Sequence, residues 1–282
     1  MRRLLAVLTC ICSWSIASAA PLLIRFPPAT SPQDVRYAYT IDLLHLALDL
    51  TGGNYRMEPA RLPMDNDRII RELSTPGGLI NVAWIQTTRE REQQLLPVRF
   101  PIYRGLLGWR LLLIRSEDQP LFDRIDKLDA LRRFSVGLQK GWPDVDIMES
   151  EHIPVTLSQS YDSLFTMLQK DRFDYMSRSI LEIALESEQH KGEGLAIEHG
   201  LMLHYSGDLY FFFSPTNHAL AERVNAGLLK AWHNGAFAAL FQRHWGKIIR
   251  AAHVEQRRIL PLNNPLFPDT PPEVPFLPLP RH

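Results

Sequence analysis

The sequence predicts an α/β fold, because short apolar runs alternate with segments of helical spacing along most of its 282 residues. The alternation occurs twice, on either side of an apolar run at 106–114. Strands that alternate with helices favour a parallel sheet that is covered by helices. Two further helical segments, 219–232 and 237–245, follow at the C-terminal side. We therefore expect two α/β units that are closed by a pair of helices.

The first unit is predicted from apolar runs and from the residues that end them. Pro27-Pro28 closes the first run, and Gly52-Gly53 ends a segment of helical spacing. Asp65 or Asn66 can cap the next helix, which Pro76-Gly77-Gly78 stops. The order is strand, helix, strand, helix, strand, at 22–26, 39–50, 55–58, 66–73 and 79–85.

The second unit shows the same alternation. A run at 134–138 leads into Gly141-Trp142-Pro143, and Ser160 can cap the helix that follows at 161–170. Expected strands lie at 134–138, 154–157 and 173–176, expected helices at 126–133, 144–150, 161–170 and 180–188, and further apolar runs at 195–205 and 209–213.

The N-terminal segment is typical of a secretory signal. Arg2 and Arg3 precede an apolar stretch at 4–16 that is too short to span a bilayer, and Ala17-Ser18-Ala19 matches a cleavage site. Both cysteines of the chain lie in this segment. We expect cleavage after Ala19, a periplasmic location and a mature chain without a disulfide.

Composition excludes several classes of function. The basic and acidic residues balance at 31 each, so loss of Arg2 and Arg3 leaves a net charge of −2, which does not suit a nucleic-acid binder. No second run is long enough to span a membrane. His199 and His204 match a metal site poorly, and no P-loop, nucleophile elbow or zinc signature occurs. We expect neither a metal nor a cofactor.

The last 22 residues contain eight prolines and should be extended. The sequence leaves two alternatives open. This tail is either a loose terminus or a strap across a lobe, held by Leu262, Leu266, Phe267 and Phe276.

Several motifs occur in a fixed order within residues 22–250. They are Tyr39–Leu44, Thr88–Glu92 with Phe100–Tyr103, Phe134–Gly141, Leu168–Asp174, and Val224–Leu228 with Trp232, Gly235 and Trp245-Gly246. Together they resemble the type 2 periplasmic solute-binding proteins, and in particular family 3, which includes polar amino-acid binders. Asp171 stands at a position where this family usually has glycine.

The resemblance implies two lobes that are joined by two crossing strands and close as a hinge around a ligand. Lobe 1 would comprise 20–103 and 206–260, lobe 2 would comprise 104–205, and 261–282 would form the tail. The implied function is periplasmic binding of a small solute by a monomer, for delivery to a membrane permease or for reporting to a sensor receptor.

On lobe 1, Arg91 matches the family arginine that grips the carboxylate of the ligand, which a guanidinium fork suits. Thr88 matches the threonine that assists it. Gln86 and Trp84 stand where the family has small hydroxyl residues. Two alternatives remain: 89–92 could be a solvated helix start, and Trp84 could be a core aromatic residue.

On lobe 2 the chain departs from the family. Trp142 and Pro143 replace the glycine and hydroxyl residues whose N–H groups hold an anion, and Pro143 has no N–H. Ser179 stands where amino-acid binders carry a carboxylate, and the neighbouring Arg178 would repel an ammonium unless it lies on the surface. A non-amino organic acid or an aromatic acid fits both lobes.

Two other functions remain open. A periplasmic dehydratase on the same fold would need an acid–base pair in the cleft, and none of the seven expected site residues is a carboxylate or a histidine. A module that has lost its small ligand and binds a protein partner is compatible with the departures at Pro143 and Ser179.

Overall fold

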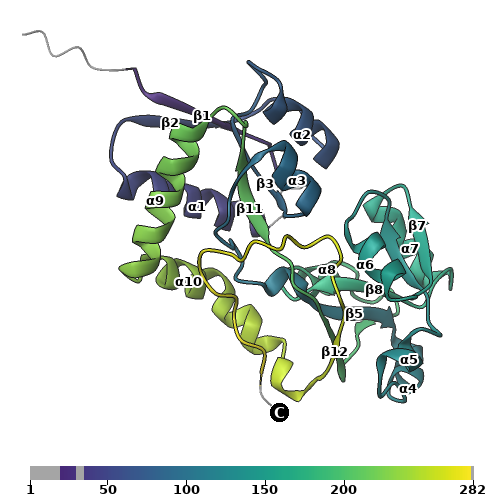
Figure 1. Ribbon diagram of the computed structural model, residues 1–282. Coiled ribbons are helices and arrows are strands. Elements are labelled where there is room, and N and C mark those ends of the chain that lie inside the picture. The colour runs from purple at the N-terminus through teal and green to yellow at the C-terminus, as the bar shows by residue number, and fades with distance from the viewer. Residues whose placement is uncertain (1–19, 30–34, 281–282) are drawn as a thin grey trace, which may run out of the picture.

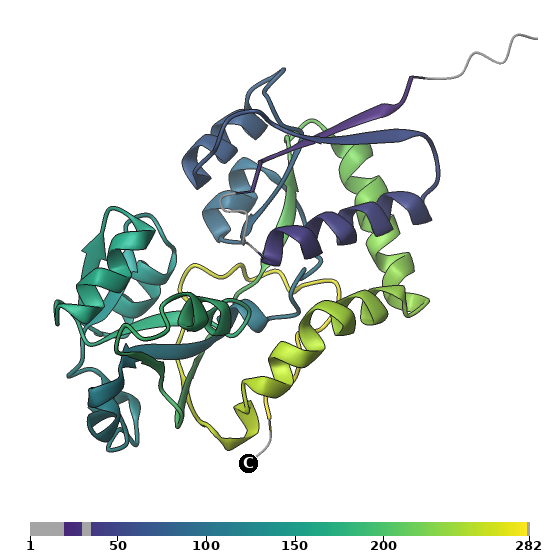
Figure 2. The ribbon, with the colours of Figure 1, turned by 180° about the vertical axis from the view of Figure 1, so that it is seen from behind.

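The computed structural model describes residues 20–29 and 35–280, which form two α/β lobes joined by two crossing segments (Figures 1 and 2). The predicted signal, residues 1–19, lies outside the described residues. Within those described ranges, no helix is long and apolar enough to cross a membrane. The α/β prediction is confirmed.

The first lobe contains two small sheets. The parallel pair is β1 (Leu22–Phe26) with β2 (Tyr55–Pro59), and the antiparallel sheet is β3 (Val82–Gln86), β11 (Leu209–Phe213) and β4 (Leu96–Val98) in the order β3-β11-β4. The helices are α1 (Val35–Leu50), α2 (Asn66–Ser74), α3 (Arg89–Gln94), α9 (His218–His233) and α10 (Ala236–Ala251). The expected single parallel sheet is therefore wrong in part, because β11 returns from the other lobe and pairs with β3 in the opposite direction.

The second lobe is built on a seven-stranded mixed sheet of order β12-β10-β5-β8-β6-β7, with β9 paired to β5. Its strands are β5 (Trp109–Arg115), β6 (Val136–Gln139), β7 (Val155–Ser158), β8 (Tyr175–Ser179), β9 (Leu195–Ile197), β10 (Leu201–His204) and β12 (Arg258–Pro261). The helices are α4 (Gln119–Phe122), α5 (Leu128–Leu131), α6 (Asp144–Ser150), α7 (Tyr161–Gln169) and α8 (Ile183–Gln189). Short 3-10 turns lie at Leu106–Gly108, Ser116–Asp118 and Val254–Gln256.

Local chemistry explains where the helices begin. The carboxylate of Asp65 accepts a hydrogen bond from the N–H of Arg68 at 2.8 Å at the start of α2. The hydroxyl of Ser160 accepts one from the N–H of Ser163 at the start of α7. Both caps were predicted from the sequence, since these side chains satisfy N–H groups that the first helical turn leaves unpaired.

The two crossing segments, 103–108 and 205–208, lie against each other. The N–H of Tyr205 donates to the carbonyl of Gly108 at 3.2 Å, and a Cβ at Gly108 would lie 1.8 Å from the carbonyl oxygen of Tyr205, so only glycine permits this approach. The fully buried carboxylate of Asp208 accepts hydrogen bonds from the N–H groups of Tyr103, Gly105 and Leu209. Asp208 thus ties the second crossing to the first.

The C-terminal segment 262–280 is extended and lies against both lobes, which matches the strap alternative (Figure 1, yellow). On the second lobe, the N–H of Leu262 donates to the carbonyl of His204 at 2.8 Å. On the first lobe, the N–H of Glu273 donates to the carbonyl of Arg99 at 2.9 Å. Strand β12 places residues 258–261 on the sheet of the second lobe, and the lobe limits given above stay a prediction.

The buried position of Asp208 predicts a pH dependence of stability. Burial raises the pKa of Asp208 to about 7, against the effect of its N–H partners. The unfolded carboxyl has a pKa of about 3.9, so the free energy of unfolding should fall as the pH rises from about 4 to about 7, by a few kcal/mol at most. Urea unfolding of the wild-type protein at pH 5 and at pH 8 measures this loss.

The variant Asp208→Asn should be less stable by about 1–3 kcal/mol, because its amide nitrogen cannot accept from a backbone N–H. It should also lose much of the difference between pH 5 and pH 8. An equal difference in the variant and the wild type would show that another group titrates.

Candidate functional site

A cleft of about 490 Å³ lies between the first turn of α3 on the first lobe and the turn between β6 and α6 on the second. Thr88, Arg89, Glu90 and Arg91 line it on one side. The other side is lined by residues 140–143 and by Val145, Asp146 and Leu157, and Pro265 and Leu266 of the C-terminal segment complete the cleft. All three parts of the chain thus meet at this cleft.

Thr88 and Arg91 are fixed by the start of α3. The hydroxyl of Thr88 accepts a hydrogen bond from the N–H of Arg91 at 3.1 Å, which is a helix cap. This cap places the arginine side chain back over the end of β3, where its Nη1 donates to the carbonyl of Gln86 at 2.6 Å. The family-like threonine and arginine therefore belong to one local structure.

The guanidinium of Arg91 is buried without a partner of opposite charge. The residue is 9% exposed, and no carboxylate within the described part of the chain forms an ion pair with it. Burial lowers the pKa of Arg91, and Asp67 and Glu90 offset only part of this effect. A buried charge with one neutral acceptor retains most of its capacity to bind an anion.

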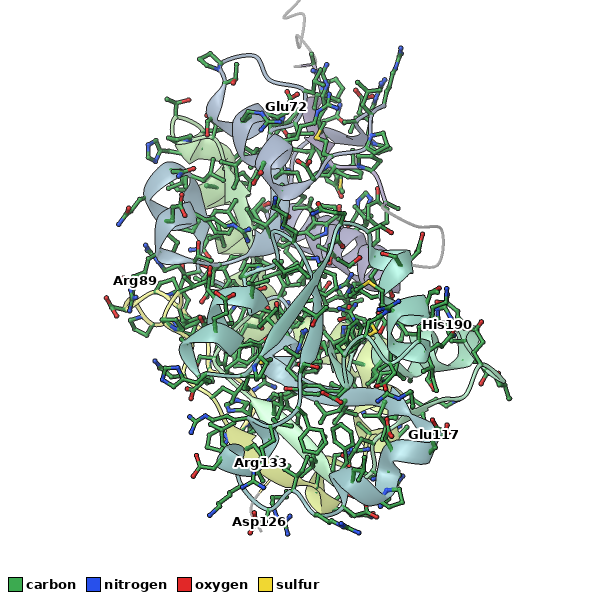
Figure 3. The ribbon with its side chains drawn as sticks, turned by 90° about the vertical axis from the view of Figure 1, so that its right-hand side faces the viewer. Glu72, Arg89, Glu117, Asp126, Arg133 and His190 are labelled. Carbon is green, nitrogen blue, oxygen red and sulfur yellow. The ribbon has the colours of Figure 1, made fainter. Side chains whose placement is uncertain are left out.

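Two other cations lie at the cleft. Arg89, which is labelled in Figure 3, is already engaged. Its side chain contacts Asp269 at 2.9 Å and also the carbonyl of Pro265. Lys140 is exposed at the carboxyl end of β6. Arg91 and Lys140 therefore present positive charge to the cleft from the two facing lobes.

The predicted aromatic residue of the second lobe, Trp142, is half-buried in the wall of the cleft. The guanidinium carbon of Arg178 lies 4.8 Å from its ring centroid, and 5.4 Å from that of Tyr161. Such cation–π contacts orient the indole ring. Trp142 is thus fixed between the cleft and an ionic cluster behind it.

That cluster neutralises Arg178, which is 5% exposed. Its Nη2 lies 2.6 Å from a carboxylate oxygen of Glu186 and 2.9 Å from one of Glu182, and the hydroxyl of Tyr161 donates to Glu186 at 2.6 Å. The expectation that Arg178 repels an ammonium, and the alternative that it lies on the surface, both lose their basis. Its charge is buried and compensated.

An ion pair reaches this cluster from the first lobe. Arg36 at the start of α1 lies 2.7 Å from the second carboxylate oxygen of Glu182. Burial alone would raise the pKa of Glu182, but the guanidinium groups of Arg178 and Arg36 outweigh it and lower the pKa. The contact between Arg36 and Glu182 therefore joins the lobes electrostatically.

A second buried pair fixes the start of α6. Arg110 on β5 lies 2.7 Å from Asp144, whose carboxylate also accepts a hydrogen bond from the hydroxyl of Tyr205 at 2.5 Å. Because Tyr205 belongs to the second crossing segment, this pair connects the turn that carries Trp142 to the hinge.

The other predicted site residues do not line this cleft. Trp84 is half-buried among aromatic rings, 5.9 Å from Phe26 and 5.7 Å from Tyr37 between ring centroids. Gln86 contributes its backbone carbonyl to Arg91. The hydroxyl of Ser179 is fully buried and donates to the carbonyl of Leu106 at 3.0 Å. Three predicted residues, Thr88, Arg91 and Trp142, lie in the cleft together.

Several residues of the site were not predicted. Glu182 and Glu186, the buried partners of the predicted Arg178, are two of them. Arg178 lies on β8 and Glu186 on α8, so their pairing follows from the turn between these elements. Arg36 and Lys140 gave no signal in the sequence, because only the fold places Arg36 at the cluster and Lys140 at the cleft.

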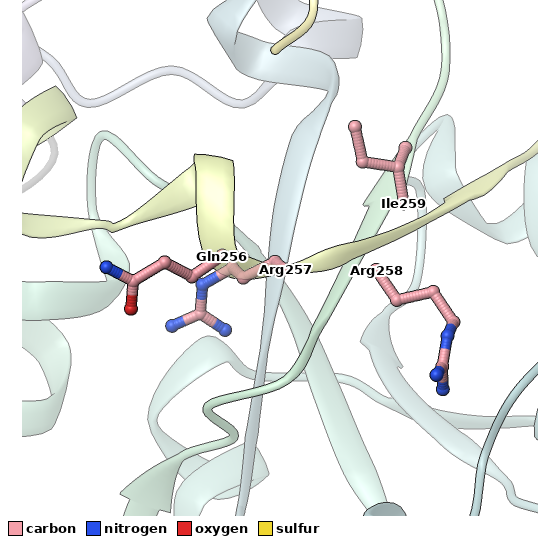
Figure 4. A pocket seen from close by; sticks show the side chains of 4 residues that line it. All are labelled: Gln256, Arg257, Arg258 and Ile259. Carbon is pink, nitrogen blue, oxygen red and sulfur yellow. The ribbon is translucent and has the colours of Figure 1, made fainter. Parts of the chain in front are cut away.

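A second hollow, of about 370 Å³, is lined by residues 256–259 (Figure 4). Its two arginines are committed to the backbone. Nε of Arg257 donates to the carbonyl of Ala252 at 2.9 Å, and Nη1 of Arg258 donates to that of Ile125 at 2.7 Å. These two guanidinium groups therefore bind β12 to the backbone at Ala252 and at Ile125.

One group of possible metal ligands lies in the second lobe, where ligand atoms of Asp123, Glu198 and His199 are within 4.8 Å of one another. The carboxylate of Glu198 already accepts hydrogen bonds from the N–H groups of Gly200 and Leu201 at 2.8 and 2.6 Å. The oxygens of Glu198 therefore stabilise the turn that precedes β10.

Comparison with known proteins identifies the fold. No family model matches the chain, and no curated protein matches it. An ancestral arginine-binding protein bound to arginine has a TM-score of 0.59 and 21% identity, and the match covers 81% of this chain and all of that one.

Two further solved structures agree. The ligand-binding core of GluR0 in complex with L-glutamate has a TM-score of 0.59 and 17% identity, with coverage of 80% of this chain and 98% of that one. A periplasmic binding protein of Salmonella typhimurium with high arginine specificity has a TM-score of 0.57 and 19% identity, with coverage of 80% and 99%. This chain has the type 2 periplasmic-binding-protein fold.

The cluster around Arg178 predicts a large loss of stability on truncation. Arg178→Ala should lower the free energy of unfolding by about 3–5 kcal/mol, because it leaves two buried carboxylates without their main partner. Urea unfolding at pH 7 measures the loss, with the exposed Arg172→Ala as the matched control. Equal stability of the two variants would contradict the structural role of the cluster.

Proposed function

We propose that this protein binds a small carboxylate-bearing solute in the cleft between its lobes, as a periplasmic receptor for transport or sensing. The observation that supports this proposal is the guanidinium of Arg91, which is 9% exposed and lines the cleft. Within residues 20–29 and 35–280, the carbonyl of Gln86 is its only hydrogen-bond partner. Burial of such a charge is costly unless it is compensated, and a bound carboxylate would supply the compensation.

The relatives in fold support this class of ligand. The solved structures are described with arginine, glutamine or L-glutamate, each of which carries a carboxylate. Others are substrate-binding proteins of amino-acid ABC transporters. The secretory signal predicted at residues 1–19 fits the proposed periplasmic location.

The ionic cluster of the second lobe does not decide whether the solute carries an amino group. Glu182 and Glu186 are balanced by Arg178 and Arg36, so this cluster adds no net charge. It neither requires nor repels an ammonium. Organic acids and amino acids are therefore both candidates, whereas a cation without an acid group is not.

Binding without catalysis is the simplest use of this cleft. Its two carboxylates, Glu90 and Asp146, are exposed, and neither is hydrogen-bonded to a histidine or a hydroxyl group among the described residues. An acid–base reaction needs groups that their surroundings orient and perturb. We therefore favour a binding protein over a dehydratase.

The variant Arg91→Met tests the proposal. Methionine keeps the apolar stem and removes the charge, so a carboxylate should bind at least about tenfold more weakly. The protein without solute should be equally stable or more stable, since an unpaired buried charge is lost. A thermal-shift screen against amino acids, aliphatic acids and aromatic acids, followed by titration calorimetry of the hits, measures both effects.

The matched control is Arg71→Met, which removes an exposed arginine from α2 on the same lobe. It should leave affinity unchanged. A carboxylate that binds Arg91→Met as tightly as the wild type would refute the role of Arg91. Failure of every acid in the screen would favour a module that binds a protein partner.

A further inference from the structure

The C-terminal segment passes from the second lobe to the first directly beside the cleft. The side-chain amide of Asn264 donates to the carbonyl of Ser206 on the crossing segment at 2.8 Å. Two residues later, the carbonyl of Leu266 accepts a hydrogen bond from the N–H of Arg89 at 2.9 Å. Pro265 and Leu266 are thereby held at the cleft from both sides.

The start of α3 uses three separate contacts to fix this part of the segment. Besides its N–H bond to Leu266, Arg89 contacts the carbonyl of Pro265 and pairs with Asp269 at 2.9 Å. Proline at 265 restricts the backbone further. Because Arg89 is two residues from Arg91, the segment is positioned by the same turn that carries the buried guanidinium.

The far end of the segment is held at the hinge. The N–H of Leu277 donates to the carbonyl of Arg104 at 2.7 Å. Phe276 lies against Gly105, where an added Cβ would be 2.9 Å from its ring. This glycine has a φ of +87°, which few other residues adopt. The segment is therefore built into the fold at both of its ends.

The cleft has a polar side on the first lobe and an apolar side formed by the second lobe and the C-terminal segment. Arg91 and Thr88 are on the first lobe, whereas Trp142, Leu157 and Leu266 offer apolar surface to the same space. Leu157 is 46% exposed there. Apolar side chains left open to a cleft gain free energy when an apolar group covers them.

We propose that the C-terminal segment is a wall of the binding site, in which Leu266 and Trp142 select a carboxylate that carries an apolar body. This inference rests on the proposed function and adds the class of solute. Arg91 holds the acid group, and the tail and the second lobe enclose the rest. A short acid such as acetate would contact Arg91 but would not reach the apolar side chains of Leu266 and Trp142.

Titration of the mature protein with acetate and with phenylacetate tests the wall. The wild type should bind phenylacetate at least about tenfold more tightly than acetate, because its phenyl ring buries apolar surface that acetate lacks. Leu266→Ala should weaken phenylacetate by about tenfold and change acetate by less than about twofold. Arg91→Met should weaken both acids.

The matched control is Leu277→Ala, a half-buried leucine of the same segment that does not line the cleft. It should leave the preference for phenylacetate intact. Hydrogen exchange at the amide of Arg89 reports docking of the segment, since this N–H is bonded to Leu266. Its protection should persist in Leu266→Ala, so that a loss of affinity is assigned to the missing side chain.

The outcomes separate the two proposals. If the wild type binds acids through Arg91 but Leu266→Ala keeps the preference for phenylacetate, the wall is refuted and the proposed function stands. If the wild type prefers acetate or binds both equally, the wall is also refuted. If neither acid binds, the wall is refuted, and the proposed function fails with it only when every other acid of the screen also fails to bind.

Discussion

The relative placement of the two lobes depends on one buried carboxylate, that of Asp208. It lies on the second crossing and accepts hydrogen bonds from the N–H groups of Tyr103 and Gly105 on the first crossing and from that of Leu209, the first residue of β11. Backbone N–H groups at a crossing have no sheet partner and need another acceptor. One side chain of the second crossing thus binds the backbone of the first, and this ties together the two segments that connect the lobe of Arg91 to the lobe of Trp142.

Charges near the cleft fall into two kinds, and the difference explains which of them can bind. Arg110 and Arg178 are buried, and each lies within 3 Å of a carboxylate. They hold α6, α8 and the ring of Trp142 in place, and they have no free capacity for a solute. Arg91 is also buried, and among the described residues its guanidinium contacts a neutral acceptor and no carboxylate. The ion-paired arginines therefore stabilise the fold around the cleft, whereas the guanidinium of Arg91 remains able to bind an anion in the cleft.

The C-terminal segment changes how such a cleft can work. In a two-lobed binding protein the hinge alone governs access, since ligand contacts come from the two lobes. Here a third part of the chain lines the cleft and is bonded at Arg89, at Arg99 and at Arg104. A movement of one lobe against the other would therefore move or strain this segment.

The sequence by itself predicted most of the elements, but not β4, α4 or β12, and it predicted one edge of the candidate site. Periodicity and caps such as Asp65 and Ser160 placed helices because these signals are local, and Thr88 and Arg91 belong to a single turn. The pairing of β11 with β3, the ion pairs of Arg178 and Arg36, and the position of Leu266 were decided only by the tertiary structure. Each joins residues that are far apart in the chain or that depend on the direction of a buried side chain, and no local pattern carries that information.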